Sequence, residues 1–305
     1  MSVTFANIWS KADKIAADRG PTPMLVLGRR DEYSMKALTA AKSRGWITPI
    51  LAYHRMQIEE RKTEPNFDDS EMEIITSSDT DKLVSKAVNR VRELNGIIMR
   101  GSVPIHNMLK GLLQPGLNFV PKGELLTHIG FFESDKFPHI IMVTDGGVII
   151  KPTLKQKTMI VKNACEAARK IGISKPRVAM LAAVESVYLT MPEALDDAVI
   201  AKMADRGTFG EAYVDGPLSF DVAIVPHAAK EKKVGGEVAG KADILVVSRI
   251  EVGNGLYKSL FMFGNARSGG VIYGGAFPVV MTSRSQQLDS KMNSIALALM
   301  IKWGG

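Results

Sequence analysis

Strand-length apolar runs alternate with helical stretches along most of this chain, and this alternation limits the possible folds more than any other feature. The first helical stretch carries apolar residues at helical spacing from Phe5 to Ala16. Strand-like runs then occupy residues 24–27, 47–53, 71–76 and 96–99, and helical stretches occupy residues 31–44, 79–94 and 105–113. Because strands joined by helices pair in parallel, this half predicts an α/β fold, with a parallel-rich sheet wrapped by helices.

The pattern changes between residues 124 and 145. Two strand-like runs, Leu125–Phe132 and His139–Thr144, are joined by a short polar turn, which predicts an antiparallel hairpin. Pro152 then interrupts the chain, so we expect a second domain to begin near Lys151. The second alternation places strands at 177–184, 211–214, 242–247 and 278–281, and helices at 155–171, 192–206, 219–232 and 289–299.

Composition and charge narrow the class of protein. The 305 residues, 46% of them hydrophobic, are enough for one large or two medium domains. The single cysteine, Cys165, excludes an intrachain disulfide and fits inert packing in a reducing compartment. The net charge of +7 is dispersed, so we expect no nucleic-acid partner. Without a signal segment or an apolar run of about 20 residues, the chain is expected to be cytoplasmic, with no membrane contact.

Several common site motifs are absent or incomplete. Residues 235–241 fit the GxxxxGK phosphate loop, but Ala242 replaces the hydroxyl residue and a strand is predicted where the motif needs a helix. There is no GxGxxG, which argues against a Rossmann-type nicotinamide enzyme, and no GxSxG nucleophile elbow. The five histidines are scattered without an HExxH, so no metal site is expected.

Three segments follow strand-like runs with small or polar residues, namely Asp215–Asp221, Ile250–Lys258 and Thr282–Arg284. A turn of this kind that opens a helix points backbone N–H groups and the helix N-terminus at an anion. Ser283 adds a hydroxyl donor, and Arg284 adds a guanidinium fork suited to phosphate. Each segment alone also fits a plain turn with a helix cap. Their combination favours a phosphate-handling enzyme.

Longer motifs carry a resemblance to a known family. They are Leu125–His128, Thr144-Asp145, Arg177–Glu185, Lys202–Gly207, Asp215–Asp221, Gly253-Asn254 with Tyr257–Leu260, Thr282–Arg284 and Ser290–Ala296. On these motifs the chain resembles the phosphate acetyl/butyryltransferase family from about Gly96 to Ala298, and most closely its butyryl branch. The first 95 residues match only in pattern.

The resemblance implies a fold and an assembly. The fold would be two α/β domains with parallel-rich sheets wrapped by helices and a cleft between the domains, similar to the isocitrate and isopropylmalate dehydrogenases. Residues 1–150 and 259–305 would form the first domain, and residues 151–258 an inserted second domain. The family also implies a homodimer, and the apolar helix Met292–Ile301 fits either a core or an interface.

The resemblance further implies the reaction acyl-CoA + phosphate ⇌ acyl phosphate + CoA, with a short acyl group such as butyryl or acetyl. The family transfers the acyl group directly in a ternary complex and uses no cofactor. This chemistry needs a phosphate clamp, a donor to the oxyanion and a group for the thiol proton. The resemblance assigns Arg284 to phosphate and Ser283 to the oxyanion. Asp289 is the third catalytic candidate, although it lies one residue, or about 100° of helix rotation, before the position of the acetyl branch's aspartate. The substrate-binding candidates are Lys110, Asp215, Gly253, Asn254, Lys258 and Ser290.

The chain departs from the family pattern at four places. Ser248-Arg249 replaces Pro-Asp before the Gly-Asn motif, and Ser285-Gln286 replaces Ala-Asp after Ser-Arg. Ser290 replaces the aspartate of the acetyl branch, one residue after Asp289, and Lys110 replaces an arginine. Two alternatives therefore stand beside the active enzyme. One is a catalytically altered relative that binds acyl-CoA or phosphate without turnover. The other is a dehydrogenase on the related fold, against which the missing nucleotide fingerprint counts.

Overall fold

A computed structural model describes residues 3–28, 32–54, 72–137, 139–282 and 287–304 of the chain, which divides into two compact units. The terminal unit comprises Ala6–Glu124 and Gly269–Gly304, and the central unit comprises Leu125–Ser268 together with Met1–Phe5. These boundaries differ from the expected ones at residues 150 and 258. The difference arises because the hairpin predicted between residues 125 and 144 pairs with a later strand of the central unit, and so belongs to that unit.

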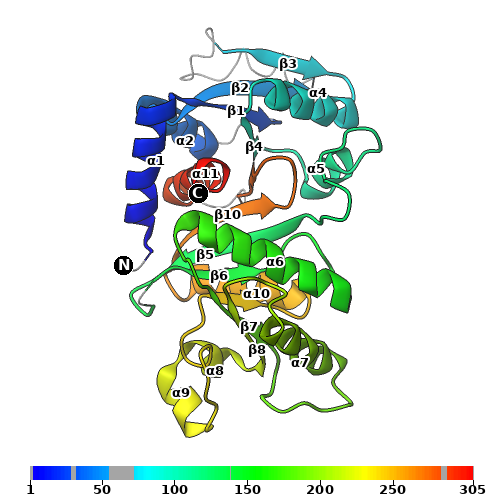
Figure 1. The fold of residues 1–305 in the computed structure, drawn as a ribbon. Helices are drawn as coiled ribbons and strands as arrows, with labels where there is room; N and C mark the ends of the chain where they lie inside the picture. The colour runs from blue at the N-terminus through cyan, green and yellow to red at the C-terminus, as the bar shows by residue number, and fades with distance from the viewer. Residues whose placement is uncertain (1–2, 29–31, 55–71, 138, 283–286, 305) are drawn as a thin grey trace. The chain divides into compact units, whose positions relative to one another are not determined.

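The terminal unit contains a mostly parallel sheet (Figure 1). Its strands are β1 (Thr22–Leu27), β2 (Ile47–His54), β3 (Ile74–Ser77), β4 (Ile97–Arg100), β10 (Arg267–Tyr273) and β11 (Val279–Val280). They lie in the order β3-β2-β1-β4-β11-β10. Neighbours from β3 to β11 are parallel, and β10 runs antiparallel to β11. The pairing of β11 with β4 brings the C-terminal part of the chain into the sheet of the N-terminal part.

Among the described residues, helices accompany these strands. They are α1 (Phe5–Arg19), α2 (Glu32–Ser43), α4 (Thr80–Glu93), α5 (Ile105–Leu112) and α11 (Leu288–Trp303). Asp79 caps α4, because its side chain accepts a hydrogen bond of 2.8 Å from the backbone N–H of Lys82. All residues of α11 from Ser290 to Ile301 are buried within this one chain, so this helix belongs to the core.

The central unit contains a second set of strands and helices. Its strands are β5 (Thr127–Glu133), β6 (Ile141–Thr144), β7 (Arg177–Leu181), β8 (Tyr213–Leu218) and β9 (Ile244–Val246), in the order β5-β6-β9-β7-β8. Its helices are α6 (Leu154–Ile171), α7 (Pro192–Asp205), α8 (Phe220–Ile224), α9 (Pro226–Glu231) and α10 (Ile250–Met262). The predicted hairpin is confirmed, since β5 pairs antiparallel with β6, and the remaining pairs are parallel.

Helix α6 shows how local signals and burial agree. Thr153 and Gln156 form a capping box at its start, and Gly172 adopts a left-handed conformation at its end. Cys165 lies on the buried face, where burial raises the pKa of the thiol to about 12. The prediction that Cys165 is an inert packing residue is therefore confirmed. Among the described residues, no helix has both the length and the apolar content needed to cross a membrane.

The predicted turn at Asp215–Asp221 is wrong. Residues Asp215 to Leu218 continue strand β8, because they pair with Ala179 and Leu181 of β7 across a register shift. The helix predicted over 219–232 is also wrong, since two short helices occupy this stretch. Pro226 begins the second of them, and a proline within one continuous helix would remove a backbone donor and clash with the preceding turn.

Two further differences concern glycine-rich segments. The glycine turn predicted after β9 is wrong, because Gly253 and Gly255 lie inside α10, which already begins at Ile250. Strand β10 was not predicted, because its glycines at 269 and 270 weaken the strand pattern. This strand forms through its pairing with β11, in which Val271 lies opposite Val280. In both cases tertiary contacts outweigh the low local propensity of glycine.

Candidate functional site

In the terminal unit, three parallel strands end side by side at one edge of the sheet. Strand β4 pairs with β1 on one side and with β11 on the other. The strand order reverses between β1 and β4, since β2 and β3 lie on the far side of β1. Ligands of open α/β sheets bind outside the carboxyl ends of the strands at such a reversal. This edge, where the strands lead into Gly28, Gly101 and Thr282, is the candidate site of the terminal unit.

Arg100 places a buried cation at this edge. It is the last residue of β4, and only 7% of its surface is exposed. One guanidinium nitrogen, Nη2, donates a hydrogen bond of 2.5 Å to the backbone carbonyl oxygen of Thr282, which is 2% exposed. A charged donor makes a stronger hydrogen bond than a neutral one. Arg100, at the end of β4, therefore binds the backbone carbonyl of Thr282, which follows β11.

The predicted catalytic pair Ser283 and Arg284 lies outside the described residues. The structure does describe what flanks the pair, with β11 before it and α11 after it. Asp289 is exposed in the first turn of α11, where the helix dipole favours a carboxylate. Ser290, in contrast, is 5% exposed, and its carbonyl accepts a 2.7 Å hydrogen bond from Ser294. Of these two candidates, Asp289 is the more accessible to a substrate.

Lys110 lies on α5 and is already engaged. Its Nζ lies 2.8 Å from a carboxylate oxygen of Asp81 on α4, and this hydrogen bond raises the pKa of Lys110. The lysine side chain is 71% exposed. An exposed pair of this kind is weak, typically worth about 0–1 kcal/mol, so an anionic ligand can replace Asp81 as the partner.

In the central unit, the turn after β6 is organised around Asp145. One carboxylate oxygen accepts hydrogen bonds from the backbone N–H groups of Gly147 (2.7 Å) and Val148 (2.8 Å), and the other accepts from His128 (3.1 Å). The residue is 2% exposed. Burial raises the pKa of Asp145 to about 6, although the backbone N–H groups favour the ionised form. The carboxylate thus fixes this turn and joins it to β5.

Helix α10 packs directly on this turn through Gly253. A Cβ atom at Gly253 would lie 2.7 Å from the Cα of Gly146 and 3.0 Å from the carbonyl oxygen of Asp145. Both contacts are with backbone, so only glycine allows this approach. On the next turn of the helix, the ring of Tyr257 lies 5.8 Å from the ring of His128, centroid to centroid. The structure therefore brings the Gly253-Asn254 motif together with the Thr144-Asp145 motif.

The exposed side of α10 carries the other binding candidates. Asn254 and Lys258 are both exposed, and four residues separate them, so they lie on the same face of the helix. Gly255, also exposed, would carry a Cβ with no atom within 4 Å. This face therefore offers an amide, a cation and unobstructed backbone in the second and third turns of the helix. Such an arrangement suits an anionic ligand.

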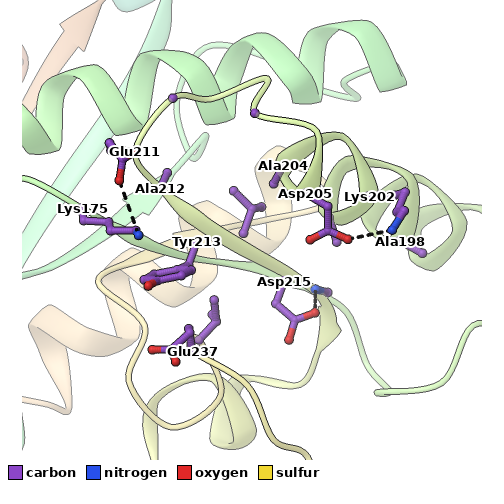
Figure 2. A pocket seen from close by; sticks show the side chains of 16 residues that line it. Lys175, Ala198, Lys202, Ala204, Asp205, Glu211, Ala212, Tyr213, Asp215 and Glu237 are labelled. Atoms are coloured by element: carbon purple, nitrogen blue, oxygen red, sulfur yellow. Dashed lines mark hydrogen bonds and ion pairs between the residues drawn. The ribbon is translucent and has the colours of Figure 1, made fainter.

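Asp215 does not join this group. It lies on β8, and β7 separates β8 from β9. It lines a cavity of about 710 Å³ beside α7 (Figure 2). The two lysines of this cavity lie next to carboxylates, Lys175 at 3.4 Å from Glu211 and Lys202 at 2.9 Å from Asp205. The cavity therefore has no surplus of positive charge that would hold phosphate.

Arg249 makes an ion pair that the sequence did not indicate. Its guanidinium lies 2.8 Å from a carboxylate oxygen of Glu193 on α7, and this hydrogen bond lowers the pKa of Glu193. Both side chains are partly exposed. Arg249 also precedes the first residue of α10, in an extended conformation. The cation that replaces the family's acidic residue is thus tied to α7 through Glu193.

Within the described ranges, no group of three histidine, cysteine, aspartate or glutamate side chains is placed to hold a metal ion. Neither Arg100 nor Asp145 was predicted as an individual site residue. A signal for Asp145 was available, because an aspartate followed by two glycines after an apolar strand is typical of a turn in which the carboxylate binds backbone N–H groups. Arg100 gave no such signal, since its partner is 182 residues away in the chain.

The raised pKa of Asp145 predicts a pH-dependent contribution to stability. The folded pKa of about 6 exceeds the unfolded value near 3.8, so the contribution is fully present below about pH 4 and is lost as the pH rises through 6. In Asp145→Asn this dependence is absent. We expect the difference in unfolding free energy, wild type minus variant, to fall by about 1 kcal/mol between pH 5 and pH 7. Denaturant unfolding at pH 5, 6 and 7 measures it. A difference that grows with pH would mean that the backbone N–H groups outweigh burial.

Comparison with known proteins identifies relatives of this chain. The sequence pattern of the family described as phosphate acetyl/butaryl transferase matches residues 105–299. A phosphate butyryltransferase from Clostridium acetobutylicum is 37% identical over 273 residues, which cover 89% of this chain and 90% of the relative.

Solved structures agree with the sequence relatives. The crystal structure of a branched-chain phosphotransacylase from Enterococcus faecalis V583 has a TM-score of 0.80 and 30% identity, and the match covers 93% of this chain and all of that chain. A putative 4-hydroxythreonine-4-phosphate dehydrogenase from Salmonella typhimurium has a TM-score of 0.53 at 13% identity, with 92% of this chain and 99% of that chain covered. The second likeness concerns the fold alone, and it agrees with the predicted dehydrogenase-like architecture.

Proposed function

Because this chain belongs to the phosphate acetyl/butyryltransferase family, we propose that it is a phosphate acyltransferase that converts a short-chain acyl-CoA and phosphate into acyl phosphate and CoA. The names of its relatives support butyryl or a branched short-chain acyl group. One structural observation carries the proposal. The Ser283-Arg284 motif follows β11, whose carboxyl end lies beside those of β4 and β1 at the reversal of strand order.

In the proposed reaction, a phosphate oxygen attacks the thioester carbonyl carbon and forms the new C–O bond. The C–S bond of the tetrahedral intermediate then breaks, and CoA leaves as a thiolate that takes up a proton. Arg284 holds the phosphate by two parallel hydrogen bonds, and Ser283 donates to the oxyanion. Asp289, the accessible carboxyl at the start of α11, handles the thiol proton. Lys110 and Ser290 are proposed to contact the substrates on the family resemblance.

The central unit is proposed to bind CoA through α10. Asn254 and Lys258 face one side of this helix, where an amide and an ammonium group suit the phosphates of CoA. Gly253 sets the position of this helix on the Asp145 turn. Asp215 is proposed only on the resemblance. On the same basis we propose that the enzyme uses no cofactor and works as a cytoplasmic homodimer. Light scattering at micromolar concentration tests the assembly.

A thiol-release assay tests the proposed function. Purified protein is mixed with acetyl-, butyryl- or isobutyryl-CoA, and free thiol is measured before and after phosphate is added. Phosphate-dependent release, without release by water alone, is the expected result. If the protein binds acyl-CoA but releases thiol from none of the three substrates, the catalytically altered alternative is favoured. Acyl phosphate is trapped as the hydroxamate, which distinguishes transfer from hydrolysis.

Arg249→Asp should change acyl-chain preference. The substitution removes the cation that Glu193 holds near the start of α10 and places a second carboxylate there. We expect the ratio of kcat/KM for butyryl-CoA to that for acetyl-CoA to change about threefold or more, equivalent to about 0.7 kcal/mol. The control is Glu193→Gln, which breaks the ion pair but keeps Arg249. An unchanged ratio in Arg249→Asp would exclude a role in chain selection.

A further inference from the structure

Arg100 is a charged residue in a buried position, and burial of a charge costs free energy. It is the last residue of strand β4 and lies opposite Leu27 of β1, and only 7% of its surface is exposed. A buried guanidinium loses hydration, so such a residue is retained where hydrogen bonds hold it. The edge around it is tightly packed, because a Cβ at Gly28 would lie 2.8 Å from the backbone N of Val103. A long charged side chain at this point therefore has a defined direction.

The side chain of Arg100 extends toward Thr282. The Nη2 atom of Arg100 lies 2.5 Å from the Thr282 carbonyl oxygen, and both residues are buried. The regular pairing of β11 with β4 ends at Val280 opposite Met99, so this contact extends the connection between the two strands beyond the ladder. A peptide unit is planar, so a hydrogen bond to its carbonyl restrains the orientation of the whole unit. The peptide held here is the one that follows Thr282.

Two other arginines show what an ordinary contact of this type does. Arg92 on α4 donates to the carbonyl oxygens of Leu117 (2.9 Å) and Asn118 (3.3 Å). Arg169 on α6 donates to two carbonyl oxygens in the loop before β8. Neither arginine is buried, and each tethers a loop from a helix. Arg100 differs because it is buried and acts at the strand ends where the proposed reaction takes place.

We propose that Arg100 is a positioning residue for phosphate acyl transfer. Its guanidinium fixes the Thr282 carbonyl and so sets the direction in which the chain leaves β11 toward Ser283 and Arg284. This inference rests on the proposed function of those two residues. It differs from a purely structural role in one respect. Loss of the contact affects the use of phosphate more than the use of acyl-CoA, because Arg284 is the proposed phosphate ligand.

The test uses Arg100→Met, which removes all donors at similar length, and Arg100→Lys, which keeps the charge and one donor group. Steady-state kinetics are measured with phosphate and butyryl-CoA varied in turn. For Arg100→Met we expect kcat/KM for phosphate to fall at least about tenfold, while KM for butyryl-CoA stays within about twofold. Arg100→Lys should recover part of the loss. Circular dichroism and thermal melting of each variant establish the folded fraction.

The matched control is Arg92→Met, which removes an arginine–carbonyl contact in the same unit, away from Thr282. It should leave both kinetic constants unchanged per folded molecule. If wild type is active and folded Arg100→Met keeps its kcat/KM for phosphate, the inference is overturned. It is also overturned if only the folded fraction falls, as for a structural contact. If Arg100→Met fails to fold, kcat/KM for phosphate of Arg100→Lys is the deciding measurement, and a value equal to that of wild type overturns the inference. A wild type without thiol release refutes the proposed function itself, and the inference with it.

Discussion

Replacing Arg284 by lysine is expected to lower kcat/KM for phosphate about a hundredfold, equivalent to about 2–3 kcal/mol of transition-state binding. Lysine keeps the positive charge but has no planar fork, so it cannot make two parallel hydrogen bonds to phosphate. The loss should appear mainly with phosphate as the varied substrate, while KM for acyl-CoA changes little. Thiol-release kinetics with each substrate varied in turn measure the effect.

The control for this substitution is Arg206→Lys. Arg206 is exposed at the end of α7, and the same chemical change there should leave kcat/KM unchanged. If Arg284→Lys retains wild-type kinetics in an active enzyme, the phosphate ligand is another residue. If wild type itself releases no thiol from acetyl- to hexanoyl-CoA, the catalytically altered alternative replaces the proposed function.

The substitution Gly253→Ala should have the largest effect on stability. The new Cβ would lie 2.7 Å from the Cα of Gly146 and 2.9 Å from a methyl group of Val247, so α10 must move away from the turn that Asp145 organises. Overpacking against backbone costs about 3 kcal/mol, near the upper end of its usual range. We expect a corresponding loss in the unfolding free energy of the central unit, measured by denaturant unfolding followed by circular dichroism.

Gly255→Ala is the matched control on the same helix. Its Cβ would meet no atom within 4 Å, and alanine favours a helix over glycine by about 1 kcal/mol. This variant should therefore be as stable as wild type or slightly more stable. The contrast isolates the packing contact from the general preference of a helix for alanine. Equal stabilities of the two variants would show that the turn and the helix adjust to one another without cost.

The residues that organise the two candidate sites act on partners from other segments of the chain. Arg100 acts from the end of a strand near residue 100, and its partner Thr282 lies at the end of β11. Asp145 organises its turn through His128, which lies 17 residues earlier on β5. In each unit taken by itself, these residues lie at the ends of strands, where the backbone of the sheet is fixed and the following turns are free to differ.

The sequence by itself determined the features that depend on neighbouring residues. Apolar periodicity located most of the helices and strands, because each period reflects only the local geometry of the backbone. The cap at Asp79 is an interaction over three residues, so it too could be predicted. The motifs from Leu125 to Ala296 were sufficient to identify the family, because they fix residue types at many positions at once.

Only the tertiary structure decided the features that depend on contacts between distant segments. Asp215 lies in a strand because β7 pairs with it, although its local sequence predicts a turn. Gly253 lies inside a helix because α10 must approach the backbone of Gly146. Arg100 appears in the sequence as an ordinary strand residue, and its contact with Thr282 spans 182 positions. Such contacts depend on how the strands are ordered in the sheet, which local periodicity does not specify.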